Sequence, residues 1–173
     1  MKRFAVSTIA TVMFTLAGAI PVAAAGATVD TFPVTFTITS AQCGNLPAGT
    51  TINGSGAETS ITTVRTDASG VTTIENSTHA QGTATDNQGN TYVFNYANSF
   101  RVSNTVASPG RFSGNMTDAF SLAGNGPAQL HNGFSAGLTS SDGFATITWS
   151  SVTSRGDPIS FGSGAVIAHC DPL

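Results

Sequence analysis

The segment from Val71 to Val102 constrains the fold most, because it predicts a hairpin whose cross-strand pairs can all be counted. Its two halves are joined by Asp86-Asn87-Gln88-Gly89-Asn90, which is typical of a type I turn with Gly89 in the left-handed bulge position. Placing Asp86 opposite Asn90 puts mostly small residues against rings on one face, in the pairs Ala84–Tyr92, Gly82–Phe94, Ala80–Tyr96 and Asn76–Phe100. The other face pairs polar residues, namely Gln81–Asn95, Ser77–Ser99 and Glu75–Arg101. Because a slip of one residue would reverse both faces, this register is strongly specified.

A second turn supports the same assignment of faces. Asp67-Ala68-Ser69-Gly70 resembles the first turn, and counting outward from it pairs Val64 with Ile74 and aligns Glu58 with Ala80. Val64 therefore falls on the face that the rings of the next hairpin occupy. Two independent turns predict one β-meander with an aromatic face.

The rest of the chain also reads as strands, with no capped helical period after the N-terminal segment. We predict strands from Thr31 to Thr39 and from about Glu58, with an irregular stretch between them that ends in an Asn53-Gly54 turn. Further apolar runs follow, at Phe112–Leu122, Leu130–Leu138, Ala145–Trp149 and Ile159–Cys170. About eight strands joined by tight turns indicate an all-β fold, an antiparallel up-and-down β-barrel, with a β-sandwich as the alternative.

The first 27 residues have the pattern of a secretion signal. Lys2 and Arg3 precede an apolar stretch that Pro21 ends, and small residues suited to cleavage follow at Ala23-Ala24-Ala25 or Ala25-Gly26-Ala27. The stretch is short for a membrane span and has no basic flank after it. We therefore expect residues 1–27 to be removed, residues 28–173 to form one domain, and the protein to be secreted without stable membrane insertion.

Composition excludes some partners and cofactors. Residues 28–173 contain four arginines, no lysine and nine acidic residues, a net charge of −5. Nucleic-acid binding requires clustered basic residues, so it is not expected. No spacing of His, Cys or carboxylate residues is typical of a metal site, and no cofactor is predicted. The two cysteines, Cys43 and Cys170, are predicted to form a disulfide in an exported protein.

The candidate catalytic and ligand-binding residues lie on the aromatic face. Asp118 alternates in step with Phe112, Met116 and Phe120, so its carboxylate is directed to the apolar side, and Glu58 aligns with Tyr96. Burial there would raise the pKa of either carboxyl, as a general acid requires, so both are candidate catalytic residues. The alternative is that Asp118 satisfies backbone amides or lies at a wet rim. We expect ligand contacts from Tyr92, Phe94, Tyr96, Asn98, Phe100, Phe112, Met116, Phe120, Asn132 and Phe134.

The opposite face has fewer candidate functional residues. Glu75 is flanked by Arg101 and Arg65, which predicts either an anion site or, more simply, a solvated charge patch. His79 and His131 have no neighbouring nucleophile, so we interpret them as surface histidines.

Two segments resemble a family of uncharacterised exported proteins from actinomycete bacteria. They are His-Ala-Gln-Gly-Thr-Ala-Thr-Asp-Asn-Gln-Gly-Asn-Thr-Tyr-Val-Phe-Asn-Tyr from His79 to Tyr96, and Met-Thr-Asp-Ala-Phe-Ser-Leu-Ala-Gly-Asn-Gly-Pro from Met116 to Pro127. This resemblance covers most of the chain but implies no function. In strand pattern alone, the chain is also similar to allene oxide cyclase-like and dirigent-like barrels, which shape a reactive small molecule inside eight strands.

Three functions follow as hypotheses. The first is a secreted barrel that binds an apolar or aromatic small molecule in its lumen, oriented by Asp118, Asn98 and Asn132. The second is a cyclase or isomerase in which Asp118 polarises the substrate. The third is a structural or envelope-associated protein whose Thr-rich exterior contacts carbohydrate.

Overall fold

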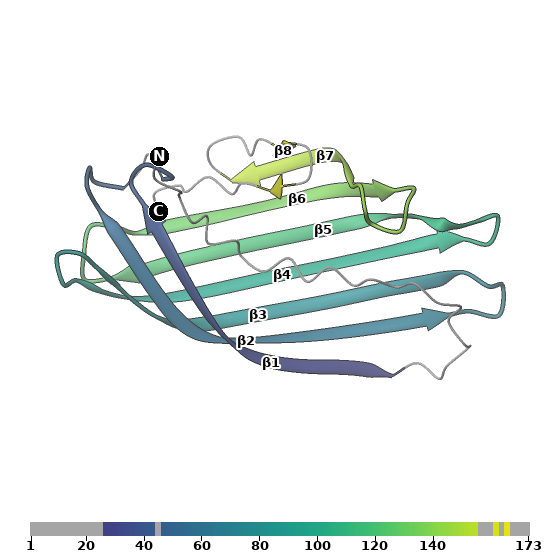
Figure 1. Cartoon of the computed structure of the whole chain (residues 1–173), viewed down its shortest axis with the longest axis horizontal. Helices are drawn as coiled ribbons and strands as arrows, with labels where there is room; N and C mark the ends of the chain where they lie inside the picture. Colours follow the sequence, from purple (N-terminus) through teal and green to yellow (C-terminus); the bar gives the residue numbers. More distant parts are fainter. Residues whose placement is uncertain (1–25, 44–45, 156–160, 163–164, 167–173) are drawn as a thin grey trace, which may run out of the picture.

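The computed structural model describes residues 26–43, 46–155, 161–162 and 165–166, and every regular element in them is a strand. Seven strands form one antiparallel sheet in chain order, so each pairs with the next along the chain (Figure 1). They are β1 (Ala27–Thr39), β2 (Thr51–Thr66), β3 (Thr72–Asp86), β4 (Thr91–Thr105), β5 (Ser108–Gly124), β6 (Leu130–Ser140) and β7 (Thr148–Arg155). β8 (Phe161–Gly162) and β9 (Ala165–Val166) form a separate two-stranded ladder. The all-β, up-and-down architecture predicted from the sequence is confirmed.

The predicted turns set the register of the central strands. At the β3–β4 turn, the Asp86 amide donates to the Asn90 carbonyl at 3.0 Å, and the Gly89 amide donates to the Asp86 carbonyl at 3.1 Å. Gly89 has a φ of 86°, which a residue with a Cβ rarely adopts. The β2–β3 turn at Asp67–Gly70 repeats this arrangement. All the cross-strand pairs counted from the two turns are present in the structure.

The ladders between β1 and β6 pair even-numbered residues with even-numbered residues, so these side chains share one side of the sheet, which we call the inner face. One end of the inner face holds the core. Its largest enclosed side chains are those of Tyr92, Phe94, Ile52, Leu122 and Leu130. Odd-numbered side chains form the outer face and are mostly exposed. The alternation is thus that of a sheet with one packed and one solvated side.

The sheet is strongly curved. Phe36 of β1 contacts Phe94 of β4 edge-to-face at 4.9 Å between ring centroids, and Phe120 of β5 at 5.6 Å. Two strands separate β1 from β4 in the sheet, so these rings meet only because the sheet coils around its inner face. Figure 1 shows the corresponding bend in β1 and β2.

Three local predictions are wrong. Asn53-Gly54 is not a turn, because Gly54 pairs with Phe36 inside the β1–β2 ladder and the Phe36 ring covers the space beside it. The second strand accordingly begins at Thr51 rather than near Glu58. The strand predicted from Ala145 begins at Thr148, because Asp142 holds the Thr146 amide at 2.8 Å and prolongs the β6–β7 turn.

The seven-stranded sheet is one continuous layer, unlike the two packed sheets of a sandwich. Among the described residues, no ladder joins β1 to β7, so these strands form an open, coiled sheet rather than a closed barrel. Most of the run predicted as a last strand, Ile159–Cys170, lies outside the described residues. Cys43 is fully buried in the core, but Cys170 also lies outside, so the disulfide between them stays a prediction.

Candidate functional site

A polar band crosses the inner face beside the core, with Asp118 of β5 at its centre. The Tyr96 hydroxyl donates to Asp118 Oδ2 at 2.8 Å, and the Asn98 amide donates to the same oxygen at 2.9 Å. Both donors lie on β4, and Asn98 pairs directly with Asp118 across the β4–β5 ladder. None of the described residues forms a hydrogen bond with Asp118 Oδ1. Within the described residues, Tyr96 and Asn98 therefore fix one carboxylate oxygen of Asp118, and the other oxygen receives no bond from them.

Burial shifts the ionisation of this band. Desolvation raises the pKa of Asp118 above its ordinary value, and the hydrogen bonds from Asn98 and Tyr96 offset part of the shift. Burial also raises the pKa of Glu58 on β2. The pKa of the Tyr96 hydroxyl rises for the same reason, and the negative charges of Asp118 and Glu58 add to it. Glu58 pairs with Ala80, and Ala80 pairs with Tyr96, so the predicted alignment of Glu58 with Tyr96 is confirmed.

A second hydrogen-bonded group extends the band toward β2. The Asn76 amide donates to the hydroxyls of Ser60 and Thr62, both at 2.9 Å, and the Thr78 hydroxyl donates to Asn76 Oδ1 at 3.0 Å. These side chains occupy the inner face between Glu58 and the β2–β3 turn. The band is therefore a preorganised polar strip, although its hydrogen-bond partners were not identified from the sequence.

The predicted ligand residues divide into two groups. Tyr92 and Phe94 are only 2% exposed, so they support the core rather than present a surface. The Tyr92 hydroxyl donates to Asp86 Oδ2 at 2.8 Å, which ties the ring to the β3–β4 turn. Asn98, Asn132 and Phe134 are also buried. The half-buried members are Tyr96, Phe100, Phe112, Met116 and Phe120. All of them border Asp118 except Phe112, which lies six residues away along β5 and stacks on Phe144.

Charges are divided between the two faces. The carboxylates of Asp30, Glu58, Asp86 and Asp118 occupy even-numbered strand positions, whereas Arg65, Arg101 and Arg111 occupy odd-numbered ones. In β1 to β6, the inner face therefore carries these carboxylates without an Arg or Lys side chain, and Glu75 lies with the arginines on the outer face.

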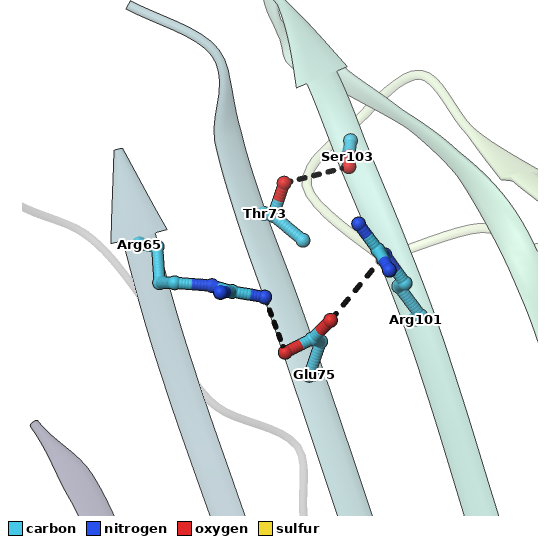
Figure 2. A network of polar contacts seen from close by, with 5 residues as sticks. All are labelled: Arg65, Thr73, Glu75, Arg101 and Ser103. Atoms are coloured by element: carbon cyan, nitrogen blue, oxygen red, sulfur yellow. Dashed lines mark hydrogen bonds and ion pairs between the residues drawn. The ribbon is translucent and has the colours of Figure 1, made fainter. Parts of the chain in front are cut away.

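The predicted ionic cluster lies on the outer face, as Figure 2 shows. Arg65 Nη2 lies 2.7 Å from Glu75 Oε2, and Arg101 Nε lies 3.3 Å from Glu75 Oε1. The Arg65 and Arg101 side chains are 51% and 70% exposed, so solvent screens both pairs. This geometry is that of a solvated charge patch, the simpler of the two interpretations.

The outer face also has a shallow hollow of about 110 Å³, over β3 to β6. Its floor includes Ala97 and Ala119, which pair with each other across β4 and β5. His79 stands beside Ala97, and His131 lies on β6 next to Ser121. Sequence reasoning placed both histidines on the surface but missed the hollow, whose only sequence signal is two alanines in register beside a histidine.

The described residues contain no group of three or more His, Cys, Asp or Glu side chains that could hold a metal ion. In the same part of the chain, no helix is long and apolar enough to cross a membrane. No protein-family model matches the chain, and no curated protein or solved structure shows significant similarity to it.

Proposed function

We propose that this protein binds a small molecule with an apolar or aromatic body on the inner face of its sheet, with Asp118 receiving a hydrogen-bond donor from the ligand. The observation that supports the proposal is the Asp118 carboxylate, of which only one oxygen accepts hydrogen bonds from described residues. Tyr96 and Asn98 hold one of its oxygens on the inner face, and no described residue bonds the other. Asp118 is half-buried, so its second oxygen is accessible to a hydrogen-bond donor from a ligand.

The surroundings define the ligand further. On one side of Asp118, Phe100 pairs with Met116 across β4 and β5, and on the other side Tyr96 pairs with Phe120, so apolar surface borders the carboxylate on both sides. Such a site suits a molecule with a ring or chain and a single hydroxyl, amine or similar donor. The negative charge of the band favours a donor that is neutral or positive over an anionic group.

Closure of the sheet into a barrel and export from the cell are parts of the same proposal. Closure would convert the curved inner face into an enclosed lumen, and the Cys43–Cys170 disulfide would hold the end of the chain near the end of β1. The curvature that brings Phe36 onto Phe94 supports closure. The basic and apolar start of the chain supports export.

A fluorescent apolar dye tests the inner-face site. N-phenyl-naphthylamine is neutral and brightens in apolar surroundings, so we expect its emission to rise on mixing with the purified protein. Met116→Lys introduces a charge on the inner face and should weaken dye binding by about tenfold or more. Thr117→Lys, one residue away on the outer face, is the matched control and should bind as the wild type does. Equal binding by both variants would contradict an inner-face site.

The enzyme alternative is favoured by one specific feature, the raised pKa of Asp118, because a general acid must hold its proton near working pH. Asp118→Asn separates the two functions. The Asn98 amide and the Tyr96 hydroxyl can still donate to the remaining oxygen, so the variant should fold and keep its affinity for a neutral ligand. A cyclase or isomerase would lose turnover while retaining binding.

A further inference from the structure

We infer that the outer-face hollow is a binding site for a neutral saccharide, separate from the inner-face site. The hollow receives side chains from four adjacent strands, and the six on the outer side are His79, Asn95, Ala97, Ala119, Ser121 and His131. It lies on the solvated outer face of the sheet. Its chemistry points to one class of ligand.

The floor is apolar and the rim is polar. Ala97 and Ala119 present methyl groups side by side, whereas Asn95 and Ser121 pair with each other one step along the same two strands. The amide both donates and accepts hydrogen bonds, and so does the hydroxyl. A sugar ring has the matching distribution, with C–H groups on its faces and hydroxyls at its edge.

Two imidazoles border this floor. His79 pairs with Ala97 from β3, and His131 pairs with Ser121 from β6. Because neighbouring strands lie about 4.8 Å apart, the backbones of β3 and β6 are about 14 Å apart, which leaves room for a ring between the two histidines. The imidazole of His79 can exchange hydrogen bonds with hydroxyls at the edge of such a ring.

The charges around the hollow argue against an anionic or cationic ligand. No described side chain that lines it carries a carboxylate, ammonium or guanidinium group. The ionic cluster around Glu75 lies two cross-strand pairs farther along β3, about 13 Å from His79 at the strand rise. A charged ligand would gain little at this site, whereas a neutral polyol can satisfy the rim.

The neighbouring surface can extend the contact to a saccharide chain. The next row of outward pairs runs Ser77–Ser99–Thr117–Ser135 across β3 to β6, so four strands present hydroxyls in register. The Ser99 and Thr117 hydroxyls are 2.8 Å apart and bond to each other. This row of hydroxyls adjoins one side of the hollow and can contact a sugar unit next to the one that the hollow holds.

Affinity electrophoresis in gels containing neutral polysaccharides tests this site. Dextran, laminarin and galactomannan serve as probes, and heparin serves as the anionic comparison. We expect at least one neutral polysaccharide to retard the wild-type protein and heparin to have no effect. Retardation by heparin alone, or by none of the four polymers, would overturn the inference.

Two variants locate the binding. Ala119→Leu fills the floor with a larger side chain on an exposed position, so it should weaken the retarding interaction by about tenfold or more. Ala123→Leu is the matched control, because Ala123 lies on the same face of β5 but outside the hollow, and it should behave as the wild type does. Asn95→Ala removes a rim amide without adding bulk and should also weaken binding.

Met116→Lys keeps this experiment distinct from the test of the inner face. That substitution should weaken dye binding by about tenfold or more and leave polysaccharide binding intact. Loss of polysaccharide binding in Met116→Lys but not in Ala119→Leu would contradict the outer-face assignment.

Discussion

Gly54 and Phe36 should be energetically coupled, because the Phe36 ring occupies the space that a side chain at position 54 would need. A Cβ added to Gly54 would overlap the ring, with the Cδ1 atom only 2.9 Å away, and no backbone atom is among its three nearest neighbours. Gly54 pairs directly with Phe36 in the β1–β2 ladder, so the ring covers the glycine of the partner strand. Gly54→Ala therefore forces the ring to move.

The expected cost of Gly54→Ala follows from overpacking. Forcing an extra methyl into a packed region costs about 1–3 kcal/mol. For a domain of this size, that loss lowers the melting temperature by roughly 3–10 °C. Phe36 cannot shift freely, because its ring contacts Phe94 at 4.9 Å and Phe120 at 5.6 Å.

A double-mutant cycle with Phe36→Leu measures the coupling. Phe36→Leu alone loses the two ring contacts, each worth about 0.5–1.5 kcal/mol, but it vacates the space above position 54. Gly54→Ala should then cost less, giving a coupling free energy of about 1 kcal/mol or more in urea unfolding followed by circular dichroism.

A glycine substitution that causes no steric overlap serves as the control for this cycle. Gly110→Ala in β5 adds a Cβ with no atom within 4 Å, so it should not lower stability. If Gly54 had instead formed a turn, its substitution would be harmful whatever residue stood at position 36. A cycle that shows no coupling would refute the packing argument.

Three further predictions concern stability and covalent structure. Hydrogen bonds, led by that from the Asn90 side chain, lower the pKa of Asp86 from 3.8 to about 2, so its contribution is present above its ordinary pKa and is lost as pH falls through the folded-state value. Asp86→Asn should therefore flatten the acid limb of a plot of melting temperature against pH, and an unchanged limb would contradict this role. Glu75→Gln removes both surface ion pairs yet should cost less than about 1 kcal/mol in urea unfolding, so a larger loss would show that the patch is structural. Alkylation of the unfolded protein should label neither of its two cysteines before reduction and both afterwards, and labelling without reductant would exclude the Cys43–Cys170 disulfide.

The central hairpins were predictable because their register depends on local chemistry. Gly89 supplies the positive φ that the turn needs, and Asp86 accepts the Gln88 and Asn90 amides through one side-chain oxygen. Once a turn is fixed, the period of two determines every pair that follows. The positions of Glu58, Tyr96 and Arg101 relative to their neighbours all follow from that count.

The misread segments depend on contacts between distant parts of the chain. Asn53-Gly54 has the local composition of a turn, but the Phe36 ring and the β1–β2 ladder override it. The β4–β5 connection contains a register shift at Asn104 and Thr105, so counting could not be carried from β4 into β5. For this reason the sequence placed Asp118 on the inner face but did not identify its bonds with Tyr96 and Asn98.

The outer-face hollow was beyond prediction for the same reason. Its lining combines residues from β3, β4, β5 and β6, and two of the three ladders involved lie beyond that register shift. Ala97 and Ala119 look unremarkable in the sequence, because a small residue defines a depression only when its neighbours on the adjoining strands are known.

Native mass spectrometry of the protein purified from its native host tests the inner-face site most directly. The wild type should carry an additional small-molecule mass that dissociates on activation. The Thr117→Lys variant should retain this mass and the Met116→Lys variant should lose it. A wild-type spectrum showing only the bare polypeptide, or an added mass retained equally by Met116→Lys, would contradict the account.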